Sequence, residues 1–231
     1  MIIYSFRPDE KFQNLELTNY KLINIPLTKT VPITPRNFPD LDQFDGIAFL
    51  SSSAAKYFLA IFDGSESERM KIFSIGNKTS EILRSRFQKI IEPRIHDSDG
   101  LCAVIANAGC RNILVPRGEI HDSRFEETLG KYSIKAIEMT VYSYEKGEGQ
   151  KFLGTREMKK DGSIFVFTSS LEVNIFKNLT GNAYSKAKVF AIGPTTKKTL
   201  ETNGFRNILG VGNGDFENLI RKIDEHSGEW I

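Results

Sequence analysis

Residues 46–62, GIAFLSSSAAKYFLAIF, and residues 163–179, SIFVFTSSLEVNIFKNL, are two copies of one pattern. In each copy an apolar run suited to a β-strand ends in a cluster of hydroxyl residues, and a helical stretch follows. The pattern continues in residues 71–83, KIFSIGNKTSEIL, and 188–200, KVFAIGPTTKKTL, where a second apolar run ends at Gly-x-x-Thr before another helix. The repeat predicts two similar lobes that carry matching polar groups where strands give way to helices.

A further pair of segments extends the duplication. Both have apolar residues at positions i, i+3, i+4 and i+7, the spacing that places side chains on one face of a helix. We therefore expect a buried helix face after the second strand of each copy, made of Leu101, Val104, Ile105 and Ala108 in one and of Phe216, Leu219, Ile220 and Ile223 in the other.

Short runs rich in Ile, Val and Phe alternate with these helical segments along the chain. Continuous apolar runs are typical of strands covered on both faces, and their alternation with helices indicates parallel sheets. The sequence therefore predicts an α/β fold with two similar doubly wound parallel-sheet lobes. In such sheets ligands bind beyond the carboxyl ends of the strands, where the hydroxyl clusters fall. The expected strands are residues 2–6, 22–27, 46–50, 72–75, 113–116, 136–144, 164–168, 189–192 and 208–211.

The lobes do not follow one another as two simple halves. A unit of residues 1–30 is too short for a domain, whereas a lobe counted from about residue 145 lacks strands to complete its sheet. Joining 1–30 with 145–231 resolves both problems and leaves residues 34–140 as an inserted lobe. Residues 26–39 and 140–150 would then be two interlobe crossings, which permit hinge motion but restrain it.

The composition is ordinary for a soluble protein and is compatible with a small anionic ligand. The chain has 231 residues, of which 40% are hydrophobic and 26% charged, without an apolar stretch near the ~20 residues that span a bilayer. The start, MIIYSFRPDE, lacks the long apolar middle of a signal peptide, so we expect a cytoplasmic protein. A net charge of +2 with scattered basic residues argues against nucleic acid and leaves an anionic small molecule open.

Cysteines and histidines are few and lack the spacings of metal ligands. Cys102 and Cys110 are eight residues apart, and we interpret them as buried or inert thiols. His96, His121 and His226 show no motif such as HExxH. Neither a disulfide framework nor a metal site is predicted.

Six strings in order along the chain carry a family resemblance. They are FLSSSA (49–54), SIGNKTSEIL (74–83), LVPRGE (114–119), EMTVYSYE (138–145), VFTSS (166–170) and AIGPTTKKTLETNGF (191–205). Together they resemble uroporphyrinogen-III synthase, the cofactor-independent cyclase of tetrapyrrole and heme biosynthesis. The match extends from Ile2 to the helix ending near Ile223, and AIGPTT followed by a helix and Gly204 is its strongest part.

The resemblance implies two flavodoxin-like or related α/β lobes joined by a two-stranded ladder, with the active site in the cleft between them. It also implies the reaction of a lyase. Hydroxymethylbilane, a linear tetrapyrrole with eight carboxylates, is closed with loss of water and inversion of ring D. The substrate supplies both nucleophile and electrophile, so no cofactor or metal is expected, and orientation is the main catalytic factor. A monomer, with transient handover from hydroxymethylbilane synthase, would fit.

Candidate site residues follow from the repeat and the resemblance together. The resemblance assigns Tyr142 of TVYSY as an assisting acid, although an aromatic packing residue is the alternative. Helix starts attract carboxylates through free backbone N–H groups, and hydroxyls there also suit N-caps. Arg7, Arg117 and Lys188 could pair with carboxylates or be solvated charges at strand ends. The expected substrate-binding residues are Arg7, Ser51, Ser52, Asn77, Thr79, Arg117, Ser169, Ser170, Lys188, Thr195 and Thr196.

The chain departs from the family pattern at Leu50, Ser52, Asn77 and Ser170, which weakens statements about single hydroxyls but keeps the Gly and Thr framework. Two other classes of protein compete with the synthase. A two-lobed, non-catalytic binding protein for an anionic small molecule would have the same fold. A nucleotide-dependent enzyme would need a phosphate loop, and GVGNGD at 210–215 lacks both the Walker lysine and the full GxGxxG.

Overall fold

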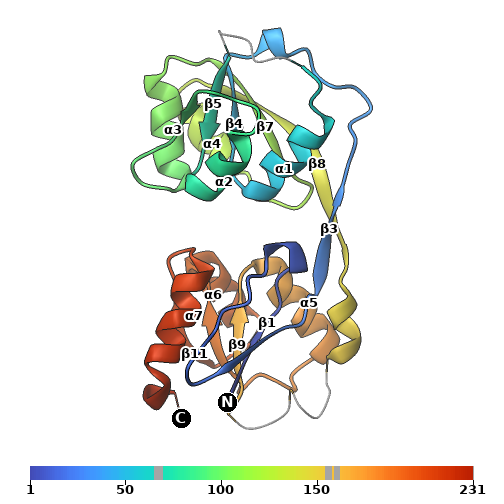
Figure 1. The fold of residues 1–231 in the computed structure, drawn as a ribbon, viewed down its shortest axis with the longest axis vertical. Helices are drawn as coiled ribbons and strands as arrows, with labels where there is room; N and C mark the ends of the chain where they lie inside the picture. Colours follow the sequence, from blue (N-terminus) through green and yellow to red (C-terminus); the bar gives the residue numbers. More distant parts are fainter. Residues whose placement is uncertain (65–69, 154–157, 159–161, 231) are drawn as a thin grey trace. The chain divides into compact units, whose positions relative to one another are not determined.

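The computed structural model describes residues 1–64, 70–153, 158 and 162–230. The chain forms two compact units, each an α/β body in Figure 1. The first unit is residues 1–30 with 145–231, and the second unit is residues 31–144. Among the described residues, no helix combines the length and the apolar character needed to cross a bilayer.

The first unit has a five-stranded sheet in which every neighbouring pair is parallel. The strand order is β11-β10-β9-β1-β2. Numbered within the unit this is 2-1-3-4-5, the flavodoxin-like order, whose topological switch point lies between β1 and β9. The strands are β1 (Ile2–Ser5), β2 (Lys21–Asn24), β9 (Ile164–Phe167), β10 (Lys188–Ala191) and β11 (Asn207–Val211).

A six-stranded sheet in the order β3-β8-β7-β4-β5-β6 forms the second body. Its β4 to β8 strands pair in parallel. The strands are β3 (Thr28–Pro32), β4 (Gly46–Phe49), β5 (Lys71–Ser74), β6 (Ile90–Ile91), β7 (Asn112–Gly118) and β8 (Lys135–Lys146).

β3 and β8 are the two strands in which the chain passes between the units. Ile33 N–H donates to the Val141 carbonyl, and Gly147 N–H donates to the Leu27 carbonyl. Because residue numbers rise along one strand as they fall along the other, this pair is antiparallel.

The two sheets have the same spatial order of equivalent strands. The order β6-β5-β4-β7-β8 matches β11-β10-β9-β1-β2 strand for strand, with the repeated sequences at β4 and β9 and at β5 and β10. The first unit is therefore a circular permutation of the second, beginning with the strands that are last in its partner. This arrangement confirms the α/β fold with two similar doubly wound lobes.

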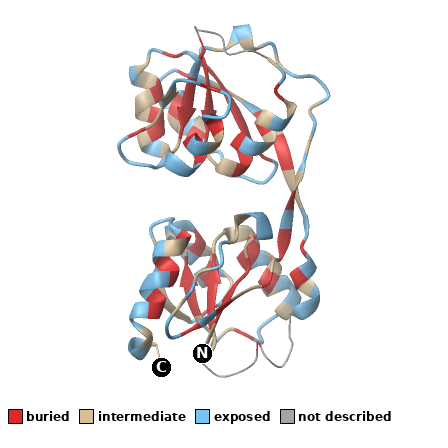
Figure 2. Cartoon of the chain, viewed as in Figure 1, coloured by how far each residue is buried: buried red, intermediate tan, exposed pale blue. Residues whose placement is uncertain are grey.

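Helices cover both faces of each sheet, and the strands are buried accordingly (Figure 2). In the first unit α5 (Ser170–Thr180) and α6 (Pro194–Thr202) pack on one face and α7 (Phe216–Glu225) on the other. In the second, α1 (Ser52–Ile61) and α2 (Asn77–Leu83) pack opposite α3 (Ser98–Asn107) and α4 (Arg124–Lys131). Within the described residues, the short 3₁₀ helices Asp9–Lys11, Leu41–Gln43 and Glu148–Phe152 lie in connections, and Ser227–Glu229 follows α7.

Two strands, β3 and β6, are absent from the strands expected from apolar runs, although the pairing of β3 with β8 is the two-stranded ladder that the resemblance implied. β3 alternates buried and exposed residues and includes Pro32, so it lacks the continuous apolar run used to recognise the other strands. β6 has only two residues. β8 is longer than expected, because it extends to Lys146 and pairs with β3 along the crossing.

Both cysteines are buried, as expected, in the core around α3. Burial, with the nearby charges of Asp99 and Glu126, raises the pKa of the Cys102 thiol to about 12. Burial also raises the pKa of Cys110. Neither thiol therefore forms the reactive thiolate readily.

Candidate functional site

The carboxyl edge of the first sheet brings several predicted residues together. Because the five strands are parallel, the loops after β1, β9 and β10 emerge at one edge, and α5, α6 and α7 begin there. Arg7 follows β1, Thr168 to Ser170 follow β9, and Gly193 follows β10. The switch point between β1 and β9 thus has an arginine on one side and hydroxyls on the other.

At the start of α5, nearby side chains form a network of hydrogen bonds that caps the helix. Ser169 is the N-cap, and its hydroxyl accepts a hydrogen bond from Glu172 N–H at 3.2 Å. Glu172, 2% exposed, accepts from Thr168 N–H and from the Thr168 hydroxyl, both at 2.6 Å. Burial raises the pKa of Glu172, while the Thr168 bonds and the Arg7 charge oppose the rise. Ser170 shares a hydrogen bond of 2.7 Å with Thr199 of α6.

The start of α6 is open by comparison. Its N-cap is Gly193, which has no side chain to satisfy the first N–H groups, and Pro194 occupies the first turn as expected. Thr195 is exposed, whereas Thr196 is buried at 4%. The prediction that threonines cap this helix was wrong, since the cap is glycine.

Arg7 lies over an aromatic ring at the same edge. Its guanidinium carbon is 4.4 Å from the centre of the Phe216 ring, at the first residue of α7. Burial lowers the pKa of Arg7, and the charges of Glu172 and Asp215 only partly oppose this shift. Arg7 is half-buried, so a strand-end charge exposed to solvent does not describe it.

The second unit repeats the helix starts at its own carboxyl edge. Ser51 caps α1 and accepts from Ala54 N–H at 3.1 Å. Ser52 follows it, half-buried, as the first residue of α1. Gly76 is the N-cap of α2, so here too glycine replaces the predicted hydroxyl cap. Asn77 is exposed and Thr79 is buried.

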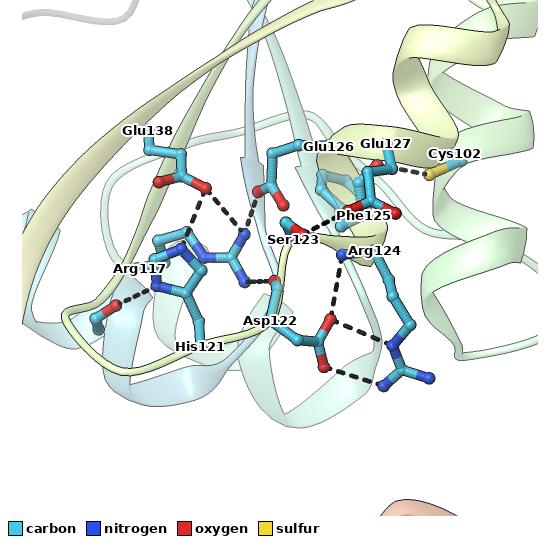
Figure 3. A network of polar contacts seen from close by, with 11 residues as sticks. Cys102, Arg117, His121, Asp122, Ser123, Arg124, Phe125, Glu126, Glu127 and Glu138 are labelled. Carbon is cyan, nitrogen blue, oxygen red and sulfur yellow. Dashed lines mark hydrogen bonds and ion pairs between the residues drawn. The ribbon is translucent and has the colours of Figure 1, made fainter.

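Arg117 is held by acceptors within its own unit (Figure 3). It donates to the Glu126 carboxylate, to Glu138 at 3.5 Å and to the Asp122 carbonyl at 3.0 Å. His121 bridges Glu138, at 3.0 Å, and the Gly118 carbonyl, at 2.8 Å. Arg117, 9% exposed, therefore joins the end of β7 to α4 and β8, and its substrate role stays a prediction.

Tyr142 of β8 lies in the core of the second unit and is 6% exposed. Its ring stacks on Tyr57 of α1, with centroids 5.4 Å apart and planes at 26°, and its hydroxyl is 3.5 Å from that of Tyr144. Tyr142 is therefore an aromatic packing residue of this unit, as the alternative interpretation predicted. The hydroxyl also lies at the end of β7, because Tyr142 is paired with Gly118.

Gly118 makes room for that ring. A β-carbon on Gly118 would be 2.6 Å from Cζ of Tyr142 and 2.9 Å from its hydroxyl oxygen. We expect Gly118→Ala to displace Tyr142 and to lower the free energy of unfolding by about 1–3 kcal/mol. Denaturant unfolding measures this, with Gly130→Ala as the control because a β-carbon there meets nothing within 4 Å. Equal stability of Gly118→Ala and wild type would show that the ring is not held against this position.

Lys188 lies apart from the other candidates. It is the first residue of β10, at the amino end of the strand, and its ammonium donates to the Trp230 carbonyl. The helix starts are at the opposite end of the same sheet. Lys188 therefore does not lie beside the other candidate residues, and the substrate role that the resemblance implies for it stays a prediction.

Sequence reasoning did not single out Glu172 or Phe216, which complete the first unit's edge. Glu172 could have been found, because Ser169 followed three residues later by Glu is the spacing of a capping box. Phe216 was assigned to a buried helix face and is buried, at 4%. Its second role, under Arg7, depends on the two loops meeting and has no sequence signal.

The fold and these edges define a class of protein: two doubly wound α/β units, one inserted in the other, with helix starts and an arginine repeated at each carboxyl edge. The sequence profile described as uroporphyrinogen-III synthase HemD matches residues 10–220. The chain therefore belongs to the uroporphyrinogen-III synthase family.

Individual relatives agree with this assignment. The chain is 26% identical over 206 residues to the uroporphyrinogen-III synthase of Chlorobaculum parvum, covering 83% of this chain and 84% of that protein. Its fold is similar to the crystal structure of the enzyme from Helicobacter pylori, at 16% identity, a TM-score of 0.63 and 95% coverage of both chains. A mutant enzyme from Thermus thermophilus is similar at 10% identity, with a TM-score of 0.60 over 99% of both chains.

Proposed function

We propose that this chain is a cyclising lyase that converts hydroxymethylbilane to uroporphyrinogen III with loss of water. The family match, which covers residues 10–220, carries the proposal. In the proposed route, loss of the terminal hydroxyl gives an electrophilic azafulvene, and ring D attacks it through its substituted carbon. The spiro intermediate then fragments and recloses with ring D inverted.

The residues at the two carboxyl edges suit an acidic substrate. The start of α6, capped by a glycine, presents N–H groups without a capping side chain, and so does α2. Such groups favour carboxylates through their partial positive charge. We assign substrate carboxylates to these main-chain donors and to the neighbouring polar side chains, which are Ser51, Ser52, Asn77, Thr79, Ser169, Ser170, Thr195 and Thr196.

Catalysis on this account is mainly a matter of orientation. Attack by the substituted carbon of ring D must be faster than simple closure through its free carbon. A protein that fixes several carboxylates restricts the bilane to shapes in which the substituted carbon meets the electrophile. The enzyme would act in the cytoplasm as a monomer that receives its unstable substrate from hydroxymethylbilane synthase.

The proposal is tested by product analysis. Hydroxymethylbilane is generated in situ, this protein is added, and the oxidised products are separated by isomer. We expect isomer III with the protein and isomer I without it. Product that stays isomer I would contradict the synthase function and would favour a non-catalytic binding protein.

Tyr142 is proposed to assist departure of the hydroxyl as a hydrogen-bond donor. Tyr142→Phe keeps the ring stacked on Tyr57 and removes only the phenol oxygen. We expect kcat to fall about tenfold, less than for the loss of a full general acid because the role is an assisting one, with the product still isomer III. Tyr132→Phe is the control, since Tyr132 is 51% exposed in the same unit. A Tyr142→Phe enzyme as fast as wild type would remove Tyr142 from the acid role.

A further inference from the structure

Arg7 and Arg117 occupy the same position in the two units. Ile3 of β1 pairs with Ile164 of β9, and Ile113 of β7 pairs with Gly46 of β4. Ile164 and Gly46 are equivalent, because each is the first residue of a strand that leads to a capping serine five residues later. Ile3 is therefore equivalent to Ile113, and four residues further on Arg7 is equivalent to Arg117.

Arg7 lies just after β1 and Arg117 lies near the end of β7, the strands at the switch points of their units, yet their surroundings differ. Arg117 has carboxylates from α4 and β8, Glu126 and Glu138, and a carbonyl from Asp122. In the first unit, the connection that corresponds to α4 is the one-turn helix Asp9–Lys11. The helix that supplies the partner of Arg117 is thus missing beside Arg7.

The carboxylates that follow Arg7 in the sequence, and that of Glu172 at the start of α5, are engaged elsewhere. Asp9 accepts from the Asn24 amide at 2.8 Å, and Glu10 accepts from the Thr30 N–H at 3.0 Å and from its hydroxyl. Both oxygens of Glu172 accept from Thr168. Glu172 and Asp215 act on Arg7 only through their charge.

Consequently the Arg7 side chain has no hydrogen-bond or ion-pair partner among the described residues, and its Nε is buried. A cation–π contact with the Phe216 ring, whose centre is 4.4 Å from the guanidinium carbon, holds the guanidinium without using its N–H donors. A planar fork held in this way matches a carboxylate, which can accept two parallel hydrogen bonds.

We propose that Arg7 binds one particular side-chain carboxylate of the bilane, and that its equivalent Arg117 binds none because its own unit already supplies the acceptors. The inference rests on the proposed function, since it takes the octacarboxylate bilane as the ligand. On this proposal the two similar units contribute differently to recognition of the bilane carboxylates. The first unit contributes a guanidinium, whereas the second uses its arginine to hold β7, α4 and β8 together.

The first measurement compares KM for hydroxymethylbilane among three variants. Arg7→Met keeps a long, unbranched side chain beside Phe216 and loses the charge, and we expect KM to rise about tenfold or more. Arg7→Lys keeps the charge without the fork and should lie between Arg7→Met and wild type. Arg206→Met is the control, because Arg206 is exposed and precedes β11 at the amino edge of the same sheet. Its KM should stay within about twofold of wild type.

A second measurement separates binding from a structural role. Bilane analogues that each lack one carboxylate, with methyl in place of acetate or ethyl in place of propionate, are compared on wild type and on the Arg7 variants. For one analogue we expect KM on wild type to be about tenfold higher than for hydroxymethylbilane. On Arg7→Met the same analogue should raise KM by less than about twofold, because the variant and the analogue each remove the same arginine–carboxylate interaction. For the other analogues, the rise in KM caused by the missing carboxylate should be the same on wild type and on Arg7→Met.

Two results would overturn the inference. They are an unchanged KM in Arg7→Met or multiplicative rises in KM for every analogue. If Arg7→Met does not fold, the same cycle is run with Arg7→Lys. Wild-type production of isomer III together with either of these results would reject the role of Arg7 and leave the proposed function standing.

Discussion

Replacing Arg117 by methionine is expected to destabilise the second unit by about 3 kcal/mol. The change removes the guanidinium but leaves Glu126, whose side chain is 16% exposed, without its positive partner. One oxygen of Glu126 already has no partner within the described residues. Breaking a buried pair by removing one member costs more than the pair contributes, because a buried charge is left uncompensated.

The double variant Arg117→Met with Glu126→Gln tests this cause. We expect it to recover part of the loss, since the uncompensated carboxylate is gone. Arg124→Met is the matched control, because Arg124 and Asp122 form an ion pair whose side chains are 69% and 58% exposed. Its loss should lower the free energy of unfolding by less than about 1 kcal/mol. Urea unfolding measures all three variants, and a wild-type midpoint for Arg117→Met would refute the role given to this network.

Replacing Asp224 by alanine is expected to destabilise the first unit by a similar amount, about 3 kcal/mol. Asp224, near the end of α7, accepts hydrogen bonds from Thr18 N–H and Asn19 N–H, both at 2.8 Å, and from Tyr20 N–H at 3.1 Å. These bonds hold the turn that leads into β2. Without the carboxylate the three backbone donors lose a charged acceptor, and a donor left unsatisfied in a buried site costs about 1–3 kcal/mol.

Hydrogen exchange measures this prediction locally. The amides of residues 18–20 should lose their protection in Asp224→Ala, and the urea midpoint of the first unit should fall. Glu225→Ala is the control, because the neighbouring Glu225 is exposed. Exchange at residues 18–20 that is as slow in Asp224→Ala as in wild type would contradict the prediction. Because the two units can unfold separately, the effects of Asp224→Ala and Arg117→Met should appear in different peptides.

The sheets were predictable because burial on both faces leaves a continuous apolar run in the sequence, as in IFVF of β9 and IIYS of β1. The repeat supplied the equivalence of the two lobes. β3 has no apolar-run signal because its stability comes from pairing with β8, more than a hundred residues later, and it was expected only through the two-stranded ladder that the resemblance implied. Nothing local in PLTKTVPI records that partner.

The site was predictable where chemistry is local. Ser51 and Ser169 are the N-caps that their positions indicated, since a cap bonds the third residue of its own helix. Local sequence patterns did not distinguish the roles of the two arginines. Arg7 and Arg117 both follow apolar strands, and what distinguishes them is the presence of carboxylates 9 and 21 residues beyond Arg117 that fold back onto it. Partners brought together by topology have no signature in a local motif.

The central claim is that the protein directs closure through inversion of ring D, and a labelled substrate tests it most directly. Hydroxymethylbilane is prepared with ¹³C at two bonded atoms, the bridge carbon between rings C and D and the ring-D carbon it joins. The proposed route breaks this bond and attaches the ring-D carbon to the former hydroxymethyl carbon. We predict that the product formed with this protein loses the one-bond ¹³C–¹³C coupling between the labels. A product that retains this coupling would show closure without inversion and would contradict the account.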